Sequence, residues 1–110
     1  MIKCYPFIIK NDPDLEKGYA NGYVAVPKNH PLYKNDWCNL DIDIHGGITS
    51  IEVFHKDPNI IQLTDDIIPE DSWVFGFDTQ HFLDNRKNWN RGMCINETLK
   101  LCEFLQDYSD

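Results

Sequence analysis

The order of apolar and polar residues along the chain predicts several short strands followed by one helix. Residues 4–10 and 22–26 are apolar and rich in β-branched or aromatic side chains, and turn-forming residues or proline end each run. Residues 48–54 and 73–78 have the same character, and Trp73, Phe75 and Phe77 share one face of the second segment. We expect these four segments to be strands of one sheet.

A fifth strand is predicted over residues 38–45, where apolar and polar residues alternate strictly before two glycines. The apolar side carries Cys38, Leu40, Ile42 and Ile44, and the polar side carries Asn39, Asp41, Asp43 and His45. Asp43 and His45 would leave the same face about 7 Å apart at the backbone. Gly46 and Gly47 can adopt positive φ and let a ligand approach closely. This face is either a polar ligand site or the solvent side of a half-exposed sheet.

The final segment predicts a helix over about residues 93–106. Its apolar residues recur at helical spacing, namely Ile95, Leu99, Cys102 and Leu105, with Cys94, Leu101 and Tyr108 widening the stripe. We expect the helix to pack on the face lined by Leu40, Ile42 and Ile44, with Leu99 in the core. The predicted fold is α+β: a single antiparallel or mixed β-sheet with one C-terminal helix packed on a face, in one globular domain over residues 1–110.

Composition and charge narrow the possible partners. Eighteen acidic and ten basic residues give a net charge of −8, which disfavours direct binding of nucleic acid. No apolar run approaches the roughly 20 residues of a membrane helix, and no secretory signal begins the chain, so we expect a cytoplasmic protein. The four cysteines, which lack CxxC spacing, are expected to be reduced, mostly buried thiols. They are Cys4, Cys38, Cys94 and Cys102.

A second group of Asp and His residues follows the predicted strand at residues 73–78. Asp78 ends that strand, and His81 and Asp84 lie in a polar segment that extends to residue 91. A carboxylate beside an imidazole can orient an acid–base group, ligate a metal or bind a polar ligand. Because HExxH and HxH motifs are missing, the sequence assigns no metal ligand, and the cofactor stays unknown.

The two groups are expected to meet if their strands are neighbours in the sheet. We predict that Asp43, His45, Asp78 and His81 converge on one concave surface. Gly46 and Gly47 would border this surface, and the loop at His30 and Pro31 would cover it. The alternative is that separated strands leave two unrelated polar ends.

An ordered set of motifs resembles a family of small proteins from bacteriophages and bacterial genomes that has no assigned activity. The motifs are GYVAVP at residues 22–27, HPLY at 30–33, DxHGGIT at 43–49 and GFDxxH at 76–81. The resemblance covers roughly residues 20–105, and it implies a phage or mobile-element setting. It draws attention to His30, Asp43, His45, Gly46, Gly47, Asp78 and His81. Phe82 and Leu83 before Asp84 depart from the family pattern, as does the acidic stretch at residues 56–71, and the role of Asp84 is left open.

Two functions from different classes remain. In the first, the chain is a phage-type accessory protein that sequesters or inhibits a host component, such as one of anti-phage defence. It would act through its polar Asp/His pocket, which binds a small polar ligand, or through its acidic surface, which binds a host protein. In the second, it is a metal-dependent hydrolase that uses the Asp/His clusters. The absence of nucleophile motifs such as GxSxG favours the binding protein.

Overall fold

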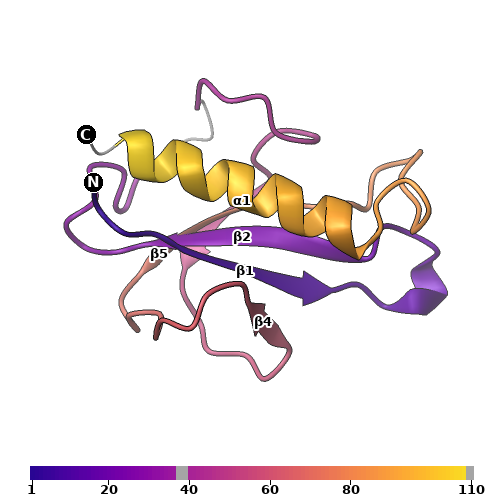
Figure 1. Cartoon of the computed structure of the whole chain (residues 1–110), viewed down its shortest axis with the longest axis horizontal. Helices are drawn as coiled ribbons and strands as arrows, with labels where there is room; N and C mark the ends of the chain where they lie inside the picture. The colour runs from indigo at the N-terminus through magenta and orange to yellow at the C-terminus, as the bar shows by residue number, and fades with distance from the viewer. Residues whose placement is uncertain (37–39, 109–110) are drawn as a thin grey trace.

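A computed structural model of the chain describes residues 1–36 and 40–108. In this part of the chain, five strands form one antiparallel sheet and one α-helix packs on it, which confirms the predicted α+β fold (Figure 1). The strands are β1 (Tyr5–Lys10), β2 (Ala20–Val26), β3 (Ser50–Val53), β4 (Ile60–Gln62) and β5 (Trp73–Phe77). The 3-10 helix η1 spans Pro13–Leu15, and α1 spans Arg91–Tyr108. The order across the sheet is β3-β5-β2-β1-β4.

Helix α1 runs along one face of the sheet, over β2 and β1 (Figure 1). Its buried residues are Cys94, Thr98, Leu101, Cys102 and Leu105, which recur at helical spacing. Leu101, Cys102 and Leu105 pack in one cluster with Val24 of β2 and with Phe75 and Phe77 of β5. This cluster is the core between the helix and the sheet.

The expectation that Leu99 lies in this core is wrong, because its side chain is 42% exposed. The buried stripe instead passes through Thr98, which is fully buried. The Thr98 hydroxyl donates a hydrogen bond to the Cys94 carbonyl at 2.7 Å, so this polar group is satisfied inside the helix. Gly22 of β2 lies opposite, where a β-carbon would come within 2.1 Å of the Thr98 hydroxyl oxygen. The close crossing of α1 over β2 therefore requires glycine.

The strand predicted over residues 38–45 is wrong for its described part. Cys38 and Asn39 lie outside the described residues, and residues 40–47 form bends and turns. The Ile42 amide donates to the Leu40 carbonyl at 2.9 Å, and the Gly47 amide donates to the Ile44 carbonyl at 2.8 Å. Ile44 is nevertheless buried, and Leu40 and Ile42 pack against the same core cluster as α1. The alternation of apolar and polar residues correctly predicted which side chains face the core. The backbone of this segment, however, forms hydrogen bonds within the segment rather than with a neighbouring strand.

The other face of the sheet is covered by the segments before and after β4, within residues 54–72, and β4 itself belongs to the sheet. Phe54 and Ile68 from this segment pack on Phe7, Ala25 and Val74 of the sheet. Strand β4 pairs with the outer side of β1. The sequence did not predict β4, because its three residues lie within an acidic stretch and are too few to show a strand pattern.

The described cysteines are buried free thiols, as the sequence predicted for the set. They are Cys4, Cys94 and Cys102. Burial raises the pKa of Cys4 to about 12 and that of Cys102 to about 11, so both thiols stay protonated near neutral pH. In residues 1–36 and 40–108, no helix is long and apolar enough to cross a membrane.

Candidate Asp/His site

A tight turn over residues 44–47 presents His45 beside α1. The Gly47 amide closes this turn on the Ile44 carbonyl, and Gly46 has φ of +68°, a value that favours glycine. The close approach of His81 also requires glycine at this position, because a β-carbon on residue 46 would lie 2.2 Å from the His81 ring carbon Cε1. The His45 amide donates to the Glu97 carboxylate at 2.9 Å, which holds the turn against the helix.

A second turn, over residues 81–84, follows the end of β5. The Asp84 amide donates to the His81 carbonyl at 2.9 Å, and the His81 amide donates back to Asp84 Oδ2 at 2.9 Å. Thr79 anchors the start of this segment, because its buried hydroxyl donates to the Ala20 carbonyl at 2.7 Å. The polar segment after β5 is thus held in place at the edge of the core.

The two turns bring His45, Asp78, His81 and Asp84 together, and we call these four residues the Asp/His site. His45 Nε2 lies 2.9 and 3.0 Å from the two Asp84 carboxylate oxygens. His81 Nδ1 lies 3.2 Å from Asp84 Oδ2 and 3.3 Å from Asp78 Oδ1. The two imidazole rings meet edge to face, with centroids 5.3 Å apart. Asp84 is therefore the centre of the site.

The site combines a buried carboxylate with accessible imidazoles. The Asp84 side chain is 6% exposed, whereas those of His45 and His81 are 25% and 40% exposed. Burial raises the pKa of Asp84, but hydrogen bonds from the His45 ring and the His81 amide outweigh it, so that pKa lies below its usual value. Trp89 packs against the His45 ring, with centroids 4.1 Å apart, and fixes the ring from the side.

Three of these side chains could hold a metal ion. His45, His81 and Asp84 each offer one ligand atom, and these atoms all lie within 4.8 Å of one another. Two neutral imidazoles and a carboxylate are a common ligand set for zinc and for other divalent transition metals. Asp78 Oδ1 lies 3.3 Å from the same nitrogen, His81 Nδ1, so it positions that ring beside Asp84, and an ion bound to Nδ1 would replace this contact.

The predicted convergence is found for His45, Asp78 and His81, with Gly46 packed on His81. Asp43 does not join them through the contacts that the structure describes. It is exposed, and its backbone carbonyl accepts a hydrogen bond from Lys100. No heavy atom lies within 4 Å of a β-carbon placed at Gly47, so that residue faces open space.

The expectation that the loop at His30 and Pro31 covers the site is wrong. His30 is buried, its Nε2 donates to the Leu105 carbonyl at 2.7 Å, and its Nδ1 accepts from the Leu32 amide at 3.0 Å. Leu105 lies eight residues after Glu97, about 12 Å farther along α1. His30 is therefore a structural residue at the other end of the helix.

The sequence did not single out Glu97, Trp89 or Lys100, and it left Asp84 undecided. One signal in the sequence could have indicated the role of Asp84. Asp84 lies three residues after His81, a spacing at which an aspartate side chain can accept a hydrogen bond from the backbone of its own turn. Glu97 and Lys100 have the same spacing on α1, where Glu97 accepts from the His45 amide and Lys100 donates to the Asp43 carbonyl just before the turn.

No family model matches this chain, and neither a curated protein nor a solved structure is significantly similar to it. The resemblance to small phage and bacterial proteins thus stays a prediction.

Proposed function

We propose that this chain is a small binding protein whose Asp/His site holds a divalent transition-metal ion. The observation that carries the proposal is the spacing of the donor atoms, since imidazole nitrogens lie 2.9 to 3.2 Å from the Asp84 oxygens. Donors bound to one metal at about 2.0–2.2 Å are separated by about 3 Å, so His45, His81 and Asp84 need little rearrangement to bind one ion.

The electrostatics of the site support a cation at this position. Asp84 carries its charge in a nearly buried place, where a bound cation would compensate it more completely than neutral donors do. The net charge of −8 on the whole chain also attracts cations over a longer range. Trp89 and Glu97 hold the ring and the backbone of His45, and such preorganisation lowers the entropic cost of binding.

The biological role that we propose is a phage-type accessory protein of the cytoplasm that sequesters or inhibits a host component. Its support is the resemblance carried by residues 22–27, 30–33, 43–49 and 76–81, together with the acidic character of the chain. The metal-bearing site would then bind a small polar ligand or a donor group on a host protein, using coordination positions that the three protein ligands leave open.

A metal-dependent hydrolase is the second candidate, and one observation favours it. The exposed edges of His45 and His81 leave the site accessible, and three protein ligands with an open position are typical of catalytic rather than structural zinc. Zinc at such a position would activate a water molecule near neutral pH.

Calorimetric titration with Zn²⁺ tests the metal site. We expect one ion per chain for the wild type, and a loss of affinity of at least about a hundredfold for His45→Ala and His81→Ala. His55→Ala is the matched control, because His55 is an exposed histidine outside the site. Equal binding by His45→Ala and by the control, both folded by circular dichroism, would contradict the proposal.

The zinc-loaded protein also separates the two candidate roles. A hydrolase is expected to turn over an activated ester or a phosphodiester such as bis(p-nitrophenyl) phosphate, and EDTA and His45→Ala should both remove that activity. A binding protein is expected to bind the ion with the same ligands and to leave both substrates intact.

A further inference from the structure

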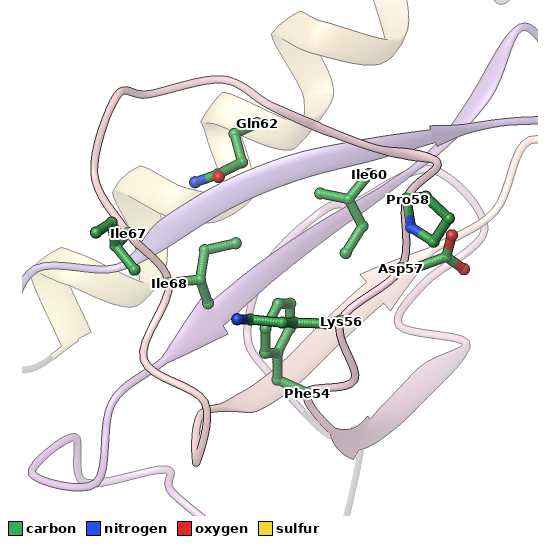
Figure 2. Close-up of a pocket in the computed structure, with 8 residues that line it drawn as sticks. All are labelled: Phe54, Lys56, Asp57, Pro58, Ile60, Gln62, Ile67 and Ile68. Carbon is green, nitrogen blue, oxygen red and sulfur yellow. The ribbon is translucent and has the colours of Figure 1, made fainter.

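The sheet face opposite α1 carries a pocket of about 370 Å³ that is separate from the Asp/His site. Phe54 and Ile68 line it and belong to the core cluster on that face, which also contains Val74, whereas the next residue, Phe75, packs toward α1. Figure 2 shows Phe54, Ile60 and Ile68 around the central hollow, with Ile67 at one end and Asp57 at the other. The pocket is therefore mostly apolar inside.

Ile67, an apolar residue that lines this pocket, is exposed to solvent rather than packed in the core. Ile67 is 88% exposed, although the neighbouring Ile68 is 5% exposed and Phe54 is 7% exposed. An isolated exposed apolar side chain is ordinary, but one that lines an apolar pocket extends the surface that a partner could cover. A pocket of this volume accommodates one large apolar side chain together with part of its flanking backbone.

The surroundings of the pocket are strongly acidic. Residues 52–71 contain six acidic residues and one lysine, a net charge of −5 out of the −8 of the whole chain. Three of these six carboxylates are paired with lysines, namely Asp66 with Lys3, Asp71 with Lys28 and Glu70 with Lys56, a residue that also lines the pocket. Among the described ion pairs, Glu52, Asp57 and Asp65 have no lysine partner and carry the remaining negative charge. A cationic partner would thus find an excess of negative charge around an apolar centre.

We propose that this pocket docks a segment of a partner protein in which a large apolar side chain is flanked by lysine or arginine residues. The apolar side chain fills the hollow between Ile60, Ile67 and Ile68, and the flanking cations lie against the acidic rim. Nucleic acid and anionic membranes are repelled by the same charge. This surface is independent of metal binding, so it goes beyond the function proposed for the Asp/His site.

Fluorescence anisotropy with three labelled synthetic peptides tests the proposal on the full chain. The first peptide carries a Leu-Phe pair between lysines, the second carries the pair between glutamates, and the third replaces the pair by serines between lysines. We expect the first peptide to bind about tenfold or more tightly than either of the others, and its affinity to fall as salt is added.

Two variants locate the binding surface. Ile67→Ser is expected to weaken binding of the first peptide about tenfold. Leu99→Ser is the matched control, because Leu99 is an exposed apolar residue on α1, which lies on the other face of the sheet, and it should bind like the wild type. Ile67 is so exposed that its substitution leaves the core intact.

Four results would overturn the proposal. They are no binding of the first peptide at low salt, equal binding of the serine peptide, equal loss of affinity in Ile67→Ser and Leu99→Ser, and stronger binding to phosphatidylserine vesicles than to the peptide. The second would mean attraction by charge alone, and the fourth would indicate a membrane surface instead.

Discussion

At the scale of single residues, Asp84 decides how the site is built. Its carboxylate joins two turns that are 39 positions apart in the sequence, through His45, and also closes the turn that contains it, through His81. Asp78 contacts only one of the two imidazoles among the contacts that the structure describes. The two carboxylates therefore have different roles.

We predict that Asp84→Asn and Asp78→Asn separate these roles. Asp84→Asn removes a metal ligand and is expected to abolish Zn²⁺ binding, whereas Asp78→Asn removes a residue that orients a ligand and should weaken binding about 10- to 100-fold. Both affinities can be measured by competition with a chromogenic zinc chelator. A greater loss for Asp78→Asn than for Asp84→Asn would show that the ligand set is assigned incorrectly.

His30 is predicted to make folding stability depend on pH. Burial lowers the pKa of His30, although the bond to the Leu105 carbonyl raises it, and protonation would place a proton on Nδ1 against the Leu32 amide. The unfolded chain thus binds this proton more readily than the folded chain. The contribution of His30 is fully present above about pH 6.5 and is lost as the pH falls through that value toward the folded pKa.

Urea unfolding between about pH 7 and pH 5 tests this prediction in the wild type and in His30→Ala. The variant loses two buried hydrogen bonds, so we expect it to be about 1–3 kcal/mol less stable at pH 7. Its stability should also fall less steeply toward pH 5 than that of the wild type. An equal pH dependence of the free energy of unfolding in the two proteins would mean that folding does not disfavour protonation of the His30 ring.

At the scale of elements, the burial of the leucines of α1 shows which face of the helix packs on the sheet. Leu101 is fully buried in the core cluster, and Leu99, two positions earlier, is 42% exposed. Leu101→Ala is expected to lower the free energy of unfolding by about 2–5 kcal/mol. Leu99→Ala should change it by no more than about 0.5 kcal/mol. Denaturant titration of the two variants would contradict the described rotation of α1 if the order of these losses were reversed.

The elements also show how far the sequence predicts this fold. Strong local patterns were sufficient for β1, β2, β5 and α1, because periodicity and turn residues there agree with the tertiary structure. The pattern over residues 40–45 predicted that Ile44 faces the core but not that Gly46 and Gly47 end a turn rather than a strand. The local bonds of this turn are completed by Glu97, whose carboxylate accepts from the His45 amide and is distant in sequence.

The same limit applies to the candidate site. His45, Asp78 and His81 could be grouped from the sequence because each lies at the end of a segment with a clear pattern. Asp84 could not be placed, since its role depends on a turn that brings it under His45. His30 looked similar to the other loop histidines, and only its burial against Leu105 assigns it to the core.

At the scale of the whole molecule, the two candidate surfaces lie on different sides of the sheet. The Asp/His site contacts α1 through Glu97, and the apolar pocket lies under residues 54–68 on the opposite face. In Figure 1, α1 lies over β2 and β1, and β4, the edge strand next to β1, lies away from the helix. Because the described contacts of the two surfaces share no residue, we expect no coupling between them.

This independence can be measured directly. Saturating Zn²⁺ is expected to change the affinity for the Leu-Phe lysine peptide by less than about twofold, and the peptide should leave zinc affinity equally unchanged. A reciprocal change of tenfold or more would show instead that the two surfaces respond to one conformational equilibrium.

Anomalous diffraction can show whether His45, His81 and Asp84 bind one metal ion. Crystals of the zinc-loaded protein, measured on both sides of the zinc absorption edge, should show one strong peak per chain. We predict that this peak lies about 2.0–2.2 Å from a nitrogen of each histidine and from a carboxylate oxygen of Asp84. A map without a peak among these three side chains, with His45 and Asp84 still hydrogen-bonded to each other, would contradict the proposed metal site.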